Sequence, residues 1–185
     1  KVSGVAQDSD VARVTVTGLP RANLQLHKLF GPLAAVGINV DAIAYALDSD
    51  GHSADCAFTV AESDLAATVQ VAGAAAVALG AREVRTRRDV AKVSLVGIGI
   101  QDTPGLAALA FATLAGAGIP IEMVTTSQVR ITCLVPESRA GEAVRALHRA
   151  FALGAPEPQA GRPHRDGYTP ALADREEVAV WTGSR

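Results

Sequence analysis

The chain repeats one pattern at two places about 80 residues apart. The segment Val14–Gly18 is matched by Val93–Gly97, and each is followed by a stretch with helical spacing. These stretches end in Val36–Asp41 and Ala117–Glu122, which match most clearly. A period this long is typical of a duplicated domain rather than of a short-period solenoid. The 185 residues therefore predict two copies of one small unit, each near the lower size limit for a stable core.

The composition predicts an aliphatic interior and excludes several function classes. Hydrophobic residues make up 49% of the chain and aromatic residues only 4%, so we expect Ala, Val, Leu and Ile to fill the core. A net charge of -2 does not favour binding to nucleic acid or to a membrane surface. No apolar run reaches the roughly 18 residues that span a bilayer, and no signal pattern opens the chain. We expect a soluble protein of the cytoplasm.

Few side chains suggest catalysis or metal binding. Cys56 and Cys133 stand among apolar neighbours without a further ligand at metal spacing, so we interpret them as buried thiols in a reducing compartment. An arginine cluster interrupted by Glu83 and Asp89 is interpreted as a solvated strand edge: Arg82, Arg85, Arg87 and Arg88. The scattered histidines are interpreted as surface or helix-face residues: His27, His52, His148 and His164. We predict no catalytic residue and no metal site.

The first copy is predicted to run strand, helix, strand, strand, helix, strand. Period-two alternation and turn residues predict the strands Val11–Leu19, Ile38–Leu47, Ser53–Val60 and Glu83–Arg87. Apolar spacing predicts a helix from Leu26 to Val36 that ends at Gly37 and contains Pro32, where a kink or restart is expected. An Ala/Val-rich helix capped by Ser63 or Glu62 runs to Gly80.

The second copy repeats this order with sharper boundaries. Asp102–Gly105 is interpreted as an N-cap followed by an N1 proline, with ligand binding as the alternative. The next helix, Leu106–Gly118, contains no charged residue, so we infer that a partner covers its outer face. Later elements are the strands Ile119–Thr125 and Val129–Val135, and the helix Glu137–Leu153 with Val144, Leu147 and Phe151 facing inward.

The second copy has no fourth strand directly after Leu153. Residues 154–176 are interpreted as a flexible linker or insertion, followed by a strand-like segment within 177–185. Either that segment or Lys1–Ala6 could complete the second sheet.

Several segments resemble the regulatory region of aspartate kinase, a pair of ACT domains. They are Asp89–Gly99, Pro104-Gly105, Ile121–Ser127, and Arg145–His148 with Phe151. The resemblance extends from about Val2 to Leu153 and resumes at Glu177. It implies an α+β fold of two ferredoxin-like βαββαβ domains packed side by side, whose antiparallel sheets carry their helices on one face. Residues 8–87 would form the first domain, and residues 1–7 with 88–153 the second.

The resemblance also implies a regulatory role in lysine, threonine and methionine biosynthesis. Family members carry an upstream kinase domain with a Lys-Phe-Gly-Gly loop that this sequence lacks, so ATP and Mg²⁺ would belong to that domain. Because the kinase domain is missing, we expect a β subunit or the regulatory tail of a longer enzyme. Lys1 is not an initiator Met, so we expect the chain to be a fragment or a processed product. Its partners would be a second ACT pair, the catalytic chain and an amino-acid effector. Two alternatives stay open: a segment of the full kinase, and a stand-alone ACT sensor or assembly module.

The family's effector site falls on positions of both copies. By resemblance, it comprises Arg21, Ala22, Asn23, Leu24, Gln25, Val40, Asp41, Tyr45, Pro120, Ile121 and Glu122. Four of these depart from the family pattern: Arg21 replaces Asp, Leu24 replaces Gly, Tyr45 replaces Gln and Pro120 replaces Asn. Arg21 would repel the ammonium of lysine or threonine, and Pro120 lacks an amide donor. The pocket is therefore either rebuilt for weak or different binding, or kept only for assembly.

Overall fold

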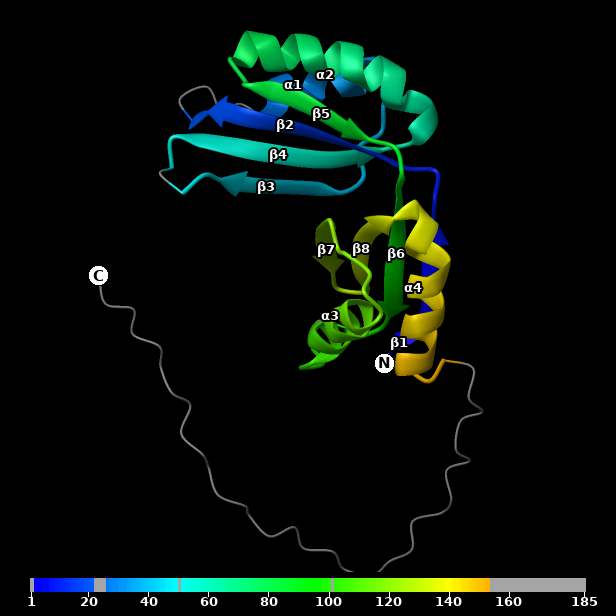
Figure 1. Ribbon diagram of the computed structural model, residues 1–185. Helices are drawn as coiled ribbons and strands as arrows, with labels where there is room; N and C mark the ends of the chain where they lie inside the picture. Colours follow the sequence, from blue (N-terminus) through cyan, green and yellow to red (C-terminus); the bar gives the residue numbers. More distant parts are fainter. Residues whose placement is uncertain (1, 22–25, 50, 101, 154–185) are drawn as a thin grey trace, which may run out of the picture. The chain divides into compact units, whose positions relative to one another are not determined.

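The computed structural model describes residues 2–21, 26–49, 51–100 and 102–153 (Figure 1). Within these ranges, the strands form two antiparallel four-stranded sheets, with orders β3-β4-β2-β5 and β1-β6-β8-β7. The 154–176 and 177–185 segments of the sequence analysis lie outside the described residues. No helix in the described part of the chain is long and apolar enough to cross a membrane.

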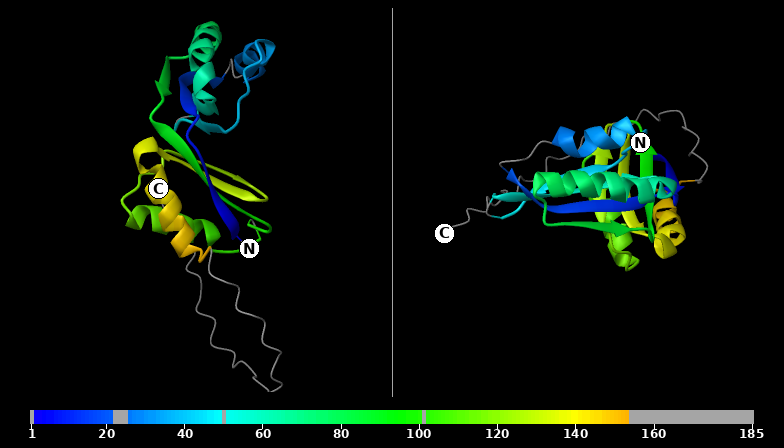
Figure 2. Two further views of the ribbon diagram at one scale, coloured as in Figure 1. Left: turned by 90° about the vertical axis from the view of Figure 1, so that its right-hand side faces the viewer. Right: turned by 90° about the horizontal axis from the view of Figure 1, so that it is seen from above.

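The first sheet is built from one contiguous stretch of chain. Its elements are β2 (Ala12–Pro20), α1 (Leu26–Ala35), β3 (Ile43–Leu47), β4 (Ser53–Val60), a 3-10 turn (Glu62–Asp64), α2 (Leu65–Leu79) and β5 (Glu83–Arg87). Both helices lie on the same face of the sheet (Figures 1 and 2). Its core contains the buried side chain of Phe58, whose ring packs edge-on against that of Phe30 with 5.2 Å between the ring centroids.

The second sheet has the same order of strands but takes one of them from the N-terminus. Its elements are β6 (Val90–Gly97), α3 (Leu106–Gly116), β7 (Met123–Ser127), β8 (Arg130–Pro136), α4 (Glu137–Ala150) and β1 (Val2–Asp8). β1 runs antiparallel to β6, with Val5 opposite Leu95. It occupies the edge that β5 occupies in the first sheet. The α+β fold with ferredoxin-like units is therefore confirmed.

The chain leaves α1 and α3 in the same way. Gly37 and Gly118 follow the two helices with φ values of 80° and 65°, which favour glycine. The next residues, Ile38 and Ile119, are buried and donate their amides to the carbonyl oxygens of Leu33 and Leu114. Gly37 thus ends its helix as predicted. β3 and β7 begin at Ile43 and Met123, later than the predicted starts at Ile38 and Ile119.

Both predicted helix caps are wrong. Asp64 occupies the N-cap of α2 and Gly105 that of α3, and neither helix has a side-chain cap hydrogen bond. Gly105 has a φ of 85°, so the chain is still turning at the point where a proline at N1 would have started the helix. Thr103 instead donates its hydroxyl to the carbonyl oxygen of Gly99.

The long helices are otherwise close to expectation. Pro32 lies inside α1 with an exposed ring, and the helix continues through it to Ala35. In α4, Leu147 is buried and Val144 is partly buried against the second core, and Phe151, just after the helix, also packs against this core, as predicted. α3 and α4 end at Gly116 and Ala150, before the predicted limits. The expected thiols, Cys56 and Cys133, are free and buried.

Candidate functional site

The two sheets meet through small and apolar side chains on their helix-free faces. On β4, Cys56 and Phe58 belong to the first core, so the alternate residue Ala57 points to the other face. Ala57 packs with Ala42 and Ala44 against a buried group from the second sheet and the connecting strands: Val11, Val90, Met123 and Leu134. The alanines allow the larger side chains to approach closely, which makes this junction a third packed cluster.

An ion cluster borders the junction. Arg13 of β2 lies directly opposite Arg87 of β5, an arrangement in which like charges destabilise a sheet. Glu122, just before β7, places Oε2 3.0 Å from Nη1 of Arg13 and Oε1 3.2 Å from Nη2 of Arg87. One carboxylate of the second unit thus offsets the repulsion between two arginines of the first.

Burial makes this cluster sensitive to change. The side chain of Glu122 is 13% exposed, that of Arg13 22% and that of Arg87 41%. The contact between Arg13 and Glu122 is ionic without hydrogen-bond geometry, since Nε of Arg13 and Oε2 of Glu122 are buried without a hydrogen-bond partner. Arg87 also donates two hydrogen bonds of 2.8 Å to Asp89 and holds the pKa of that carboxyl below its usual range.

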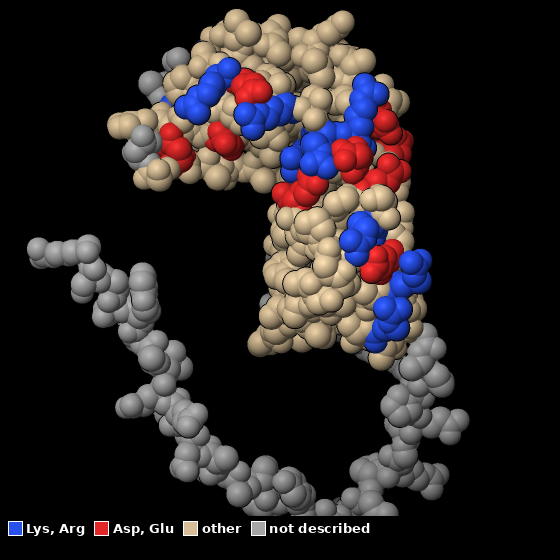
Figure 3. Space-filling model, viewed as in Figure 1, with Lys and Arg blue, Asp and Glu red and all other residues tan. Residues whose placement is uncertain are grey.

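A second ionic contact lies on the same face. Lys92 of β6, whose side chain is 12% exposed, donates from Nζ to Asp41, with Asp8 3.8 Å away. The backbone around Asp41 is held by β4, because the amide of Asp41 donates to the carbonyl oxygen of Thr59 and the amide of Ala42 to its hydroxyl. Acidic and basic side chains gather beside the passage from β5 to β6, whereas the surface over α3 is uncharged (Figure 3).

The structure distributes the predicted effector residues over several places. Arg21 is exposed after β2, and its amide donates to the carbonyl oxygen of His52. Tyr45 is 38% exposed on β3, and Val40 packs partly buried against the first core. Ala22, Asn23, Leu24 and Gln25 lie outside the described residues.

Most of the other predicted effector residues already contact other parts of the protein. Pro120 is exposed, whereas Ile121 packs against the second core. The carboxylates of Asp41 and Glu122, expected to face a ligand, are bound to basic side chains of the junction.

Sequence reasoning missed the basic partners at the junction. Arg13 and Lys92 stand at polar positions of alternating strands, a signal that marks the helix-free face but not what covers it. Arg87 lies on the edge strand β5 as predicted, with a side chain that is 41% exposed, and it also joins the cluster around Glu122. Arg82, Arg85 and Arg88 are exposed as predicted.

Exposed apolar side chains follow the edge strand β3. Ile43, Tyr45 and Leu47 are 47%, 38% and 49% exposed. β3 ends its sheet in the strand order, as β7 does in the other sheet. An apolar edge strand is a typical pairing surface.

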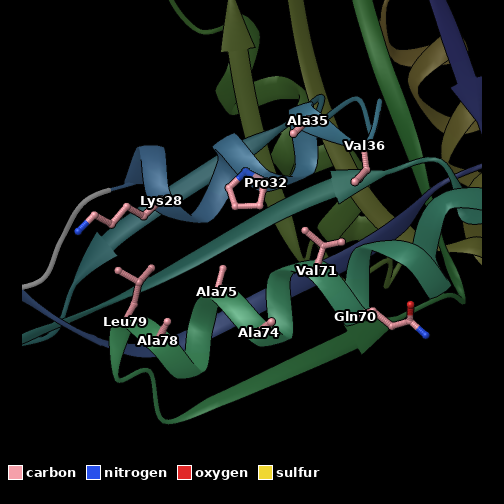
Figure 4. Close-up of a pocket in the computed structure, with 10 residues that line it drawn as sticks. All are labelled: Lys28, Pro32, Ala35, Val36, Gln70, Val71, Ala74, Ala75, Ala78 and Leu79. Carbon is pink, nitrogen blue, oxygen red and sulfur yellow. The ribbon is translucent and has the colours of Figure 1, made fainter.

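The uncharged helices also present open surfaces. Ala108, Leu109 and Ala112 are exposed on α3, and Leu109 is 45% exposed. Between α1 and α2 lies an apolar groove of about 840 Å³ (Figure 4). Val71, Ala75 and Leu79 of α2 extend into it toward α1. Such a groove offers packing surface but no reactive group.

The described residues contain no grouping typical of catalysis. Among them, no three His, Cys, Asp or Glu side chains lie together in a way that could hold a metal ion. His27, His52 and His148 are exposed, and His164 lies outside the described ranges. Burial raises the pKa of both cysteine thiols to about 11, so neither is an activated nucleophile.

Two βαββαβ units, the second completed by the N-terminal strand, define a tandem ACT-domain protein. In agreement, a family profile described as an ACT domain matches residues 93–151. A chain from the crystal structure of aspartokinase alpha and beta subunits is 34% identical, with a TM-score of 0.77 over 83% of this chain and 100% of that one. The ligand-free regulatory subunit of aspartate kinase from Thermus thermophilus is 37% identical, with a TM-score of 0.74 over 81% of this chain and 98% of that one.

Full-length relatives give the same result. Aspartate kinase of Stutzerimonas stutzeri is 37% identical over 155 residues, which are 84% of this chain and 37% of that protein. The chain belongs to the aspartate kinase family and corresponds to its ACT-domain regulatory region. It therefore spans little more than a third of the length of the curated relatives that it matches.

Proposed function

We propose that this chain regulates an aspartate kinase in amino-acid biosynthesis, either as a β subunit or as the regulatory region of a longer enzyme. The supporting observation is the tandem ACT fold, which matches a regulatory subunit over 98% of its length. A similar structure contains aspartokinase alpha and beta subunits, which supports association with a catalytic chain. That chain would bind ATP and Mg²⁺. The free cysteines favour a reducing compartment such as the cytoplasm.

We propose domain limits that agree with the two sheets except at Asp8, which pairs with Lys92 in the second sheet. We assign residues 8–87 to the first ACT domain, and residues 1–7 with 88–153 to the second. The junction around Glu122 would couple them, because a ligand that favours one arrangement by about 1 to 3 kcal/mol is sufficient for regulation.

Mixing the purified chain with the catalytic chain of an aspartate kinase tests the proposal. The chain alone should not phosphorylate aspartate. With the catalytic chain, it should form a complex and change the response of the kinase to lysine or threonine. Aspartate phosphorylation by the chain alone, or no complex at micromolar concentrations, would contradict the proposed role.

The effector pocket of this chain is proposed to be altered. Arg21, Leu24, Tyr45 and Pro120 replace the family's ligand-binding residues, and Asp41 and Glu122 already have basic partners. Lysine and threonine should therefore bind with dissociation constants of about 1 mM or weaker. A pocket kept only for assembly, or a stand-alone sensor for another ligand, is the alternative.

Calorimetry with lysine and threonine distinguishes these cases. Restoring Arg21→Asp, Leu24→Gly, Tyr45→Gln and Pro120→Asn together should improve affinity more than any single reversion, because the groups share one ligand. Micromolar affinity in the unmodified chain would disprove the altered pocket.

A homodimer through the ACT domains is the proposed assembly. It is supported by the exposed apolar edge at Ile43, Tyr45 and Leu47 and by the uncharged face of α3. Ile43→Lys and Leu109→Lys should each weaken the dimer in light scattering if their face is buried, whereas Arg149→Lys is a neutral control. A monomeric unmodified chain at micromolar concentration would contradict this assembly.

A further inference from the structure

A polar cavity of about 430 Å³ lies beside the junction, between residues 41–43 and the strands β7 and β8. Lys92, Thr125, Ser127, Arg130 and Thr132 line it from the second sheet. Its volume is within the range typical of sites for small ligands.

The register of the second sheet places donors side by side in this cavity. Thr125 lies opposite Thr132, and Ser127 lies opposite Arg130, so that all four side chains point to the helix-free face. The hydroxyl of Thr132 is also within 2.8 Å of the buried hydroxyl of Ser94. Hydroxyl and guanidinium donors therefore converge on one face.

The cationic group of the cavity that is open to a ligand is Arg130. The lining carries two cationic side chains, Lys92 and Arg130, and one carboxylate, that of Asp41. Lys92 is bound to Asp41 and also lies 3.8 Å from Asp8, so its charge is neutralised. Within the described part of the chain, Arg130 has no ion-pair partner and its side chain lies at the exposed end of β8. The guanidinium thus remains available for a planar oxyanion, which it can bind with two parallel hydrogen bonds.

The opposite wall is held in place by backbone contacts. The amide of Asp41 donates to the carbonyl oxygen of Thr59 at 3.0 Å. The amide of Thr59 donates to the carbonyl oxygen of Ala42, also at 3.0 Å. The hydroxyl of Thr59 accepts from the amide of Ala42 at 3.1 Å. A wall that is ordered before binding reduces the entropic cost of holding a ligand.

We propose that this cavity binds a small oxyanion, a carboxylate or a phosphate. Arg130 is the bidentate donor, and the hydroxyls of Thr125 and Ser127 donate the remaining hydrogen bonds. The site lies on the helix-free face, and of the residues in the proposed effector pocket its lining contains Asp41 but neither Arg21 nor Pro120. It therefore goes beyond the proposed regulatory function and does not depend on the identity of the catalytic chain.

Amide chemical shifts of the full chain, titrated with inorganic phosphate and separately with malonate at constant ionic strength, test the site. We expect saturable shifts at Thr125, Ser127 and Thr132, with a dissociation constant of about 1 mM. The ion that saturates at the lower concentration identifies whether phosphate or carboxylate is preferred.

Arg130→Gln should weaken binding at least about tenfold, since it removes the bidentate donor. Arg149→Gln removes the same charge from an exposed position on α4 and should leave binding unchanged. Ser127→Ala should weaken binding by a smaller factor. Shifts that do not saturate with either ion, or equal losses in Arg130→Gln and Arg149→Gln, would overturn the site.

Discussion

The two ACT units share a strand order but differ in how the chain completes them. In the first, β5 follows α2 directly and pairs with β2. In the second, the equivalent edge is β1, which precedes the whole first unit and pairs with β6. The first unit is therefore an insertion in the second, and two connecting segments reach it through the buried residues Val11 and Val90. The same local pattern can form one fold from either a contiguous or a divided chain.

The surfaces of the units differ as well. α4 carries an exposed ion pair between Arg139 and Glu142, which lowers the pKa of Glu142, and it turns an apolar side to its core. α2 and α3 contain no charged residue, and Val77 on α2 is 80% exposed. Partner contacts are thus expected on these helices and on the open edges, not on α4.

The largest expected effect comes from removing the strand that makes the second unit discontinuous. Deleting residues 2–8 should destabilise the second unit by more than about 5 kcal/mol, because β6 loses its paired edge and Val2 and Val5 leave the core. The first unit should retain its structure. Hydrogen exchange of the β6 and β8 amides measures the loss, with Gln7→Ala as the control. Protected β6 amides in the deletion variant would show that the N-terminal strand is dispensable.

Core cavities in each unit test whether the units unfold together. Phe58→Ala in the first core and Leu95→Ala in the second should cost about 3 to 5 and about 2 to 5 kcal/mol. If the junction couples the units, each variant lowers the midpoint of one shared calorimetric transition. Two separate transitions, only one of which moves in each variant, would show that the junction contributes little coupling.

The ion cluster is a more local test of the junction. Glu122→Gln leaves Arg13 and Arg87 opposite each other without the carboxylate, and should cost about 1 to 3 kcal/mol after allowance for the partial exposure of the arginines. Glu142→Gln, which breaks an exposed pair on α4, should cost less than about 0.5 kcal/mol. Urea unfolding measures the loss of stability in both variants. Equal losses would show that Glu122 contributes no more than an exposed ion pair.

The reaction rates of the two thiols report how readily each unit opens. Cys56 lies on β4 and Cys133 on β8, each buried in its own core with a pKa raised to about 11. At pH 8, both should react with iodoacetamide much more slowly in the folded than in the unfolded chain, because the fold disfavours the thiolate. Mass spectrometry of digests identifies which cysteine reacts first, and thus which unit opens more readily. Rates equal to those of the unfolded chain would contradict the burial of either thiol.

The raised thiol pKa values also predict that the stability of the fold decreases at alkaline pH. The folded state holds these protons more tightly than the unfolded state, so this contribution to stability is complete below the unfolded thiol pKa near 9. It decreases as the pH rises from there through about 11. Unfolding midpoints of the Cys56→Ala and Cys133→Ala variants should fall less over this range than those of the unmodified chain. An identical decrease would show that other groups control the alkaline response.

Much of each unit was predictable from local sequence. The repeat and the apolar periodicity predicted both helix-and-strand orders, and the bounds of β4 and β5 agree with the predicted ones. The turn residues between the predicted strands Ile38–Leu47 and Ser53–Val60 form a hairpin turn, in which the amides of Asp48 and Gly51 donate to the carbonyl oxygens of Ser53 and Asp48. Glycine C-terminal positions, turn residues and alternation act within a few residues, so these features can be recognised without knowing the rest of the chain.

Tertiary structure alone decided the features that join the units. Local residue patterns left open whether the N-terminal or the C-terminal segment completes the second sheet. The family resemblance favoured the N-terminal segment, and the pairing of β1 with β6 confirms it. The same resemblance proposed Asp41 and Glu122 as ligand-facing residues. The fold brings Lys92, Arg13 and Arg87 to these carboxylates from distant strands. The charge and alternation of a residue indicate which face it occupies, but its partner depends on which surfaces meet, and that is decided by long-range packing.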